Sequence, residues 1–120
     1  MALAATTREE DGVAILTPDG RLIFGEDISA LRQTVKDLIA HGKKKIVLNM
    51  EHVVKIDSVG LGVLIAVHNT AMTTGTSLRL CNLGKQVKEV LQVTKLINIL
   101  EVYGTEDDAL RAFTGFSARA

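Results

Sequence analysis

Ser58 stands directly after Asp57, at the point where a stretch with helical spacing begins. Asp and Ser are the residue types that best begin a helix, so this pair predicts a helix start. A hydroxyl in the first turn would be exposed beside free backbone N–H groups and the positive end of the helix dipole, which together favour a phosphate. Gly60 and Gly62 follow, although alanine would stabilise a helix more. Their presence predicts that another group approaches this backbone closely.

The rest of the chain alternates between strand and helix patterns. Residues 1–7 are expected to form either an edge strand or a frayed end, and Asp11-Gly12 predicts the turn of an opening antiparallel hairpin. Further strands are expected at 13–17, 45–50, 78–83 and 97–103, helices at 25–41, 57–74, 84–96 and 105–113, a turn at 18–20 and a connector at 51–55. Such alternation predicts an α/β domain with a mixed, mostly parallel sheet and about four helices.

The helix that follows Asp57 has two unlike faces when its residues are placed at about 100° intervals. The core face is expected to comprise Leu61, Leu64, Ile65, His68, Ala71 and Met72. The opposite face comprises Ser58, Val59, Gly62, Ala66, Asn69, Thr70 and Thr73. This second face is small and largely uncharged, whereas a solvated helix face normally carries charged residues. It is therefore predicted to dock a partner, the alternative being that another part of the same chain covers it.

Composition argues against several classes of function. The 120 residues suit one domain, and 14 basic residues balance 14 acidic ones, which argues against a nucleic-acid-binding surface. Cys81 is the single cysteine, so neither a disulfide nor a cysteine zinc site is expected. The start of the chain lacks a signal-peptide pattern, and the longest apolar run, residues 63–67, is too short to span a bilayer. A cytoplasmic protein without metal or cofactor is expected.

The residues around Ser58 do not form an enzyme motif. The pair Gly60 and Gly62 would need a third glycine at Ile65 to match the dinucleotide-binding fingerprint, and the chain contains no Gly-Lys-Ser/Thr tripeptide. Ser58 lacks the glycine two residues earlier that a nucleophile elbow requires. His68 lies ten residues along the same helix, about 15 Å away, and cannot serve as its base. The spacing of His41 and His52 does not exclude either as a base for Ser58, but no other feature of the sequence supports such a role. No catalytic activity is therefore predicted.

The run Asp57-Ser58-Val59-Gly60-Leu61-Gly62 resembles the Asp-Ser-Ser/Thr-Gly-Leu-Gly signature of bacterial anti-sigma-factor antagonists, a group of STAS domains. The resemblance covers nearly the whole chain. Gly20-Arg21-Leu22 is similar to the family's segment before the first helix, residues 78–83 to its penultimate strand, and Thr94-Lys95-Leu96 to part of the helix after that strand. The resemblance implies a single STAS domain over residues 1–120. From the residues themselves, 115–120 are expected to be a loose tail, and 1–6 are a loose tail if they do not form the edge strand.

The resemblance also implies a switch controlled by phosphorylation. In the family, the serine directly after the aspartate is phosphorylated by a partner that is both anti-sigma factor and serine kinase, and that position is Ser58. The unphosphorylated form binds the anti-sigma factor and frees the sigma factor. The phosphorylated form releases the anti-sigma factor, and a serine phosphatase removes the phosphate. Val59 replaces the second Ser or Thr that is frequent in the family, which leaves Ser58 as the only acceptor in the motif.

The predicted partner-binding surface combines the motif, the small helix face and one loop. Its residues are Phe24, Asp57, Ser58, Val59, Gly62, Ala66 and Asn69. Asp57 is expected mainly to cap the helix, while Ile23 and Phe24 are too apolar for a loop that faces only water. An alternative remains a constitutive STAS module, acting as a transporter subunit or a signalling scaffold, in which Ser58 is a plain helix cap.

Overall fold

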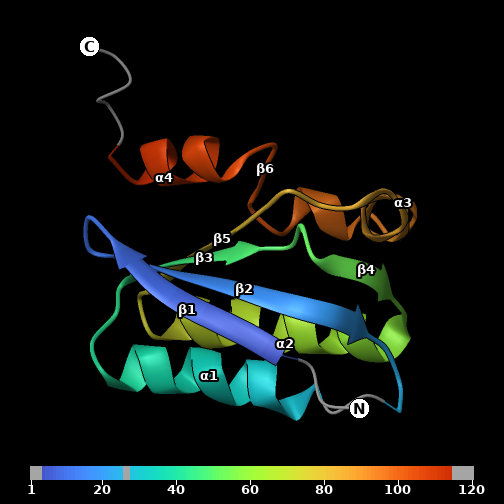
Figure 1. Cartoon of the computed structure of the whole chain (residues 1–120), viewed down its shortest axis with the longest axis horizontal. Coiled ribbons are helices and arrows are strands. Elements are labelled where there is room, and N and C mark those ends of the chain that lie inside the picture. Colours follow the sequence, from blue (N-terminus) through green and yellow to red (C-terminus); the bar gives the residue numbers. More distant parts are fainter. Residues whose placement is uncertain (1–3, 26–27, 115–120) are drawn as a thin grey trace.

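The computed structural model describes residues 4–25 and 28–114 of the chain. Its elements in chain order are β1 (Ala4–Glu10), β2 (Val13–Leu22), α1 (Ser29–Ala40), β3 (Lys45–Asn49), β4 (Val53–Ile56), α2 (Ser58–Thr73), β5 (Ser77–Cys81), α3 (Lys85–Val93), the 3-10 helix η1 (Leu96–Asn98), β6 (Val102–Tyr103) and α4 (Glu106–Thr114). Helices α1 and α2 cover one face of the sheet, α4 lies over the other, and α3 stands beside β4 (Figure 1). The predicted α/β class with about four helices is confirmed.

The sheet is mixed, as predicted. Its strand order is β1-β2-β3-β5-β6, with β4 pairing β2 off this path. The β1–β2 pair is antiparallel and the other pairs are parallel. Asp11 and Gly12 both have positive φ, 51° and 81°, which is the geometry of the predicted tight hairpin turn. β1 begins at Ala4, so residues 4–7 form the edge strand that was one of the two expected alternatives, and residues 4–6 are not a loose tail. Residues 1–3 and 115–120 lie outside the described residues.

The predicted turn at residues 18–20 is wrong, because β2 continues through it to Leu22. Pro18 pairs with Ala5 of β1 and lies between the part of β2 that pairs with β3 and the part that pairs with β4. A strand tolerates a residue without an N–H at such a place. Gly20 has φ 133° and the register with β4 shifts between Gly20 and Arg21. A bulge therefore bends the strand without ending it.

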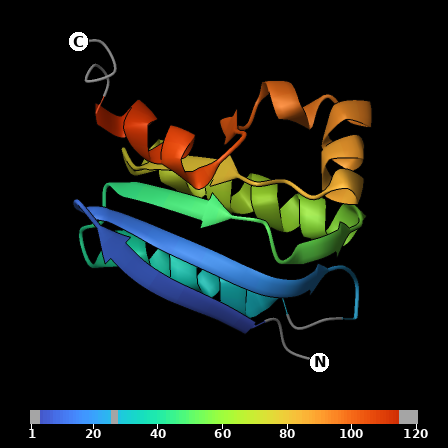
Figure 2. The ribbon, with the colours of Figure 1, turned by 45° about the horizontal axis from the view of Figure 1, so that its top comes forward.

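Two further predicted segments differ from the structure. The connector at 51–55 contains most of β4, since the long β2 extends beyond β3 and offers its last residues for parallel pairing (Figure 2). The strand expected at 97–103 is reduced to the two residues of β6, and η1 precedes it. Lys95, with φ 64°, ends the run of α3 and turns the chain into η1. Residues 51–55 and 97–103 are both apolar enough to form strands, but the length of each strand depends on the neighbouring strand that is available for pairing.

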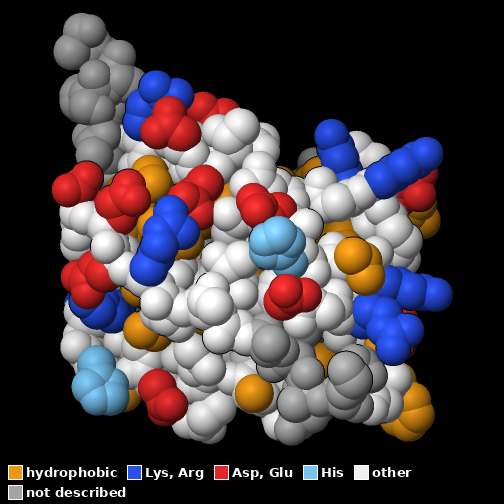
Figure 3. All heavy atoms as spheres, in the orientation of Figure 1, with side chains coloured by type: hydrophobic (Ala, Val, Ile, Leu, Met, Phe, Trp, Pro, Cys, Tyr) orange, Lys and Arg blue, Asp and Glu red, His pale blue; other side chains and the backbone are white. Residues whose placement is uncertain are grey.

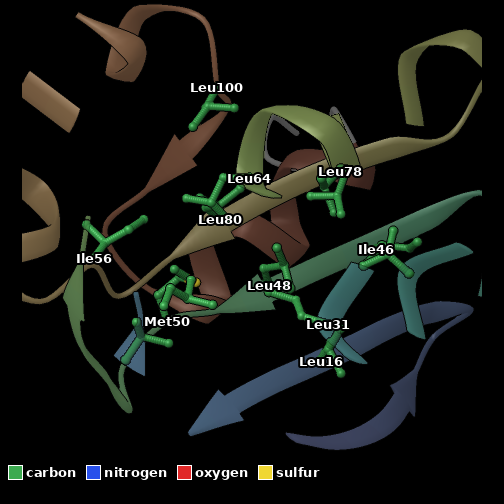
Figure 4. Close-up of a cluster of buried hydrophobic side chains, with 14 of the residues drawn as sticks. Leu16, Leu31, Ile46, Leu48, Met50, Ile56, Leu64, Leu78, Leu80 and Leu100 are labelled. Atoms are coloured by element: carbon green, nitrogen blue, oxygen red, sulfur yellow. The ribbon is translucent and has the colours of Figure 1, made fainter. Parts of the chain in front are cut away.

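Two clusters of apolar side chains make up the core. The larger lies between the sheet and helices α1 and α2 and includes Leu48, Ile56 and Leu64 (Figure 4). The smaller lies on the opposite face of the sheet, under α4, and consists of the buried residues Val13, Ile15, Val47, Cys81 and Ala109. β3 contributes to both clusters, so it is covered on both faces. Burial raises the pKa of the Cys81 thiol to about 12, with the carboxylates of Glu106 and Glu51 adding to the effect.

Thr105 caps the first turn of α4. The backbone N–H of Asp108 donates to Thr105 Oγ1 at 3.0 Å. Glu106 in the same turn accepts hydrogen bonds from Arg8 of β1 and, at 2.8 Å, from Asn49 Nδ2 of β3. These contacts fasten α4 to the sheet. No helix among residues 4–25 and 28–114 has the length and apolar character needed to cross a bilayer.

Removing the Thr105 cap should destabilise the domain moderately. The Thr105→Ala variant is expected to lose about 1 kcal/mol of unfolding free energy, because the Asp108 N–H then has no side-chain acceptor. Urea unfolding followed by circular dichroism measures this loss. A Thr105→Ser variant is the control, since serine keeps the hydroxyl and should remain within a few tenths of a kcal/mol of the wild type. Equal losses in the two variants would contradict the capping role.

Candidate functional site

Asp57 caps α2, as the sequence predicts, and it also ties a loop to the helix. Its Oδ1 accepts the backbone N–H groups of Val59 at 2.9 Å and Gly60 at 3.1 Å. Its Oδ2 accepts the N–H of Phe24 at 2.8 Å. The backbone N–H of Asp57 itself donates to Leu22 O at 3.2 Å. One carboxylate therefore joins the start of α2 to the end of β2 and the loop that follows.

Gly60 explains why the motif needs a residue without a side chain. A Cβ at this position would lie 2.0 Å from the carbonyl oxygen of Leu22 and 2.8 Å from a side-chain carbon of Ile56. The first turn of α2 therefore rests directly on the backbone of β2, and the predicted close approach is confirmed here. At Gly62 a Cβ would meet nothing within 4 Å. The chain itself does not explain Gly62, which is exposed.

Ser58 is the first residue of α2 and is exposed. The sequence predicts free N–H groups around its hydroxyl, but the structure corrects part of this expectation. Two of these groups, on Val59 and Gly60, already donate to Asp57 Oδ1. A phosphate on Ser58 would therefore compete with a carboxylate for the amides of the first turn. The favourable end of the helix dipole remains, but so does the repulsion between two anions.

The acidity of Asp57 follows from these contacts. The N–H of Phe24 is the main cause that holds the pKa of Asp57 below its ordinary value, and the amides of Gly60 and Val59 act in the same direction, while desolvation opposes them. A carboxyl whose pKa is lowered by folding stabilises the native state above its unfolded pKa of about 4. That contribution disappears as the pH falls through the lower pKa of the folded state.

The Asp57→Asn variant should lack the part of the stability that depends on the ionised Asp57 carboxylate. Asparagine can still cap the helix, but its single oxygen cannot serve both the α2 amides and Phe24. The variant is expected to melt at a lower temperature than the wild type at neutral pH, and the difference should shrink as the pH falls below about 4. Thermal unfolding between neutral and acidic pH measures this. A difference that stays constant across the range would contradict the assigned ionic contacts.

The structure exposes most of the predicted partner-binding residues. Phe24 is 79% exposed and Val59 is 40% exposed, and both lie near Asp57, which bonds the backbone of each. Gly62 and Asn69 are exposed, while Ala66 is half-buried. Helix α1 packs beside α2, so part of this helix is covered by its own chain and the rest remains open. Figure 3 shows acidic and basic side chains interspersed over the face that it draws.

The core face of α2 differs in detail from the prediction. Its buried residues are Gly60, Leu64, Val67 and Ala71. Leu64 and Ala71 are confirmed, whereas Met72, expected at the margin of this face, is 67% exposed and its placement there is wrong. The close contact of Gly60 with β2 sets the rotation of the helix, and this turns Val67 inward and Met72 outward. The remaining predicted core residues, Leu61, Ile65 and His68, are half-buried.

Sequence reasoning missed one residue at this site, Gln86 of α3. Its Oε1 accepts the backbone N–H of Ile56 at 2.9 Å, and its Nε2 donates to the carbonyl oxygen of Ile56 at 3.1 Å. The side chain thus occupies the outer edge of β4 as a neighbouring strand would. No local pattern marks a glutamine for such a role, because the contact spans 30 residues of sequence.

The family model described as "STAS domain" matches residues 4–109. The chain belongs to the STAS domain family. This STAS domain is 30% identical over 106 residues to a Thermotoga neapolitana protein named "Putative anti-sigma factor antagonist TM1081 homolog", with 88% of this chain and 93% of that protein covered. The crystal structure of a Thermotoga maritima protein described in the same terms superposes with a TM-score of 0.82 at 28% identity, covering 90% of this chain and 92% of the other.

The fold also matches the anti-sigma factor antagonist SpoIIAA. The unphosphorylated form superposes on this STAS domain with a TM-score of 0.69 at 18% identity, covering 94% of this chain and all of the other. The phosphorylated form of the Bacillus protein superposes with a TM-score of 0.68 at 19% identity, covering 92% and 99% of the two chains. At this level of identity the likeness concerns the fold alone, and it agrees with the mixed sheet and the helices described above.

Proposed function

We propose that this STAS domain is an anti-sigma-factor antagonist that binds its partner while Ser58 is unmodified and releases it when Ser58 is phosphorylated. The observation that carries the proposal is the exposed Ser58 at the start of α2, beside a carboxylate that fixes both α2 and the Phe24 loop. The partner-binding surface would comprise Phe24, Asp57, Ser58, Val59, Gly62, Ala66 and Asn69. The names of the Thermotoga relatives support the same class of partner.

The physical chemistry of the surface suits such a switch. Phosphorylation adds about −1.5 to −2 charges at neutral pH. Ser58 already lies beside the ionised Asp57, so the added phosphate would concentrate negative charge at the corner of a surface made largely of uncharged residues. An unpaired charge left in a docked interface costs about 2–5 kcal/mol, which is enough to release a micromolar complex. The exposed position lets the fold accept the same phosphate.

The proposal assigns two partner proteins. The anti-sigma factor would also be the serine kinase that modifies Ser58, and a serine phosphatase would restore the free hydroxyl. The domain would act on transcription through these proteins in the cytoplasm and would not contact nucleic acid directly.

Mass spectrometry of the intact protein with site mapping tests the acceptor. The purified domain would be incubated with ATP and a lysate of its own host, beside the Ser58→Ala and Ser77→Ala variants. Ser77 is a matched control, because it is also exposed but lies at the start of β5. We expect one phosphate on the wild type and on Ser77→Ala, mapped to Ser58, and none on Ser58→Ala.

The opposite result would change the assignment of the domain. If the same lysate phosphorylates a general kinase substrate but leaves Ser58 unmodified, the phosphorylation switch is refuted. The constitutive module, a transporter subunit or signalling scaffold, would then be the better description. Asp57 and not Ser58 caps α2, so in that case Ser58 would be only the first residue of the helix.

A further inference from the structure

Gln86 links α3 to the residue that leads into the phosphorylation motif. Both hydrogen-bonding groups of its side chain engage the backbone of Ile56, at 2.9 and 3.1 Å. Ile56 is the last residue of β4, and its side chain is buried against α2. The inner edge of β4 is held by β2, where Ile56 pairs with Leu22. Gln86 therefore completes the fixation of β4 at the residue where the chain leaves for Asp57.

Hydrogen bonds hold the residues on both sides of the acceptor, from Ile56 to Gly60. Asp57 follows Ile56 directly, donates its N–H to Leu22, and accepts the amides of Val59 and Gly60 with Oδ1. Ser58 stands between the aspartate and these amides, so its position depends on how Asp57 is held. An acceptor hydroxyl must be placed accurately for phosphoryl transfer, since misplacement by about 1 Å can cost two orders of magnitude in rate.

We propose that Gln86 is a positioning residue for Ser58, through which α3 controls how well the hydroxyl is presented to a kinase. The inference deepens the proposed function and rests on it for the phosphorylation step, but not for the effect on the structure of the motif. Gln86 belongs to the same helix as the buried Val87 and Leu91. A displacement of α3 would therefore reach Ile56 through two hydrogen bonds.

Amide hydrogen exchange tests the structural half without a kinase. In Gln86→Met the side chain keeps its length but loses both hydrogen bonds. The informative amides are those of Val59 and Gly60, which bond to Asp57 and not to Gln86. We expect them to exchange at least about tenfold faster, the factor that corresponds to the loss of one hydrogen bond. Gln92→Met, an exposed glutamine on the same helix, is the matched control and should leave both amides unchanged.

Phosphorylation kinetics test the functional half with the host kinase activity. Gln86 does not belong to the docking surface, so Gln86→Met is expected to lower kcat about tenfold with KM unchanged. Thr105→Ala, destabilised at α4 on the opposite face of the sheet, should phosphorylate at the wild-type rate although it melts earlier. This control separates positioning from a general loss of stability.

Two results would overturn the inference. The first is normal exchange at Val59 and Gly60 in Gln86→Met. The hydrogen bonds between Gln86 and Ile56 would then have no effect beyond the edge of β4. The second is a kcat in Gln86→Met equal to that of the wild type. If no variant and not even the wild type is phosphorylated, the proposed function fails instead, while the exchange experiment still decides whether Gln86 holds the motif.

Discussion

The Ser58→Asp variant is expected to bind the partner at least about 30-fold more weakly than the wild type, because a charge placed in the docked surface costs about 2 kcal/mol or more. Its melting temperature should remain close to that of the wild type. Ser58 is exposed, and an acidic residue in the first turn of α2 faces the favourable end of the helix dipole. Titration calorimetry with the purified partner and differential scanning calorimetry of the variant measure the two quantities.

The control for this variant places the same charge elsewhere. Ser77→Asp introduces an aspartate at an exposed serine of β5, which lies beside Ala71 and Met72 at the opposite end of α2 from Ser58. This variant should bind the partner as tightly as the wild type. A large fall in the melting temperature of Ser58→Asp would mean that the weaker binding reflects a damaged fold. Undiminished binding would refute the proposed docking surface at Ser58.

Gly60→Ala is expected to destabilise the domain by at least about 3 kcal/mol, although alanine favours a helix by nearly 1 kcal/mol over glycine. The new Cβ would lie 2.0 Å from the carbonyl oxygen of Leu22, a backbone atom that cannot rotate away. Relief requires α2 to move off β2, and this movement would also strain the hydrogen bond from the Asp57 N–H to the same oxygen. Chemical denaturation of the purified variant measures the loss.

Gly62→Ala is the matched control within the same helix. A Cβ there meets nothing within 4 Å, so this variant should be more stable than the wild type by about 0.5–1 kcal/mol. If Gly62 belongs to the docking surface, the same methyl group should weaken partner binding while it strengthens the fold. Equal destabilisation at the two glycines would show that helix propensity, and not the contact with Leu22, governs Gly60.

The start of α2 was predictable because its signals are local. An aspartate before a serine is a capping pattern, and the cap forms with the expected amides. The two glycines also predicted that another group approaches the backbone of α2 closely, but only the structure shows that their roles differ. Gly60 approaches β2 within the same chain, whereas Gly62 faces solvent. The spacing of the glycines in the sequence does not indicate which group, if any, contacts the backbone at each of them.

The errors in the strands have a different origin. Pro18 and Gly20 form a normal turn signal, yet both lie within β2 because that strand changes partners between Leu16 and Gly20. The four residues of β4 lack a clear alternation and become a strand because β2 offers an edge on one side and Gln86 closes the other. Such pairing joins residues about 30 positions apart, which a local pattern cannot reveal. The helix expected from residue 25 begins at Ser29 as α1, and Glu26 and Asp27 lie outside the described residues.

The burial of Cys81 has a practical consequence for studies of this domain. A thiol reacts as its thiolate, so a side chain that is fully buried, with a pKa of about 12, should not be alkylated while the domain stays folded. Each molecule that opens exposes the only sulfhydryl in the chain. When a maleimide reagent is concentrated enough to label the open form before it recloses, the labelling rate of the native protein equals its opening rate. Cys81 is therefore a natural probe of the opening of the domain, and no reactive group has to be engineered into the protein.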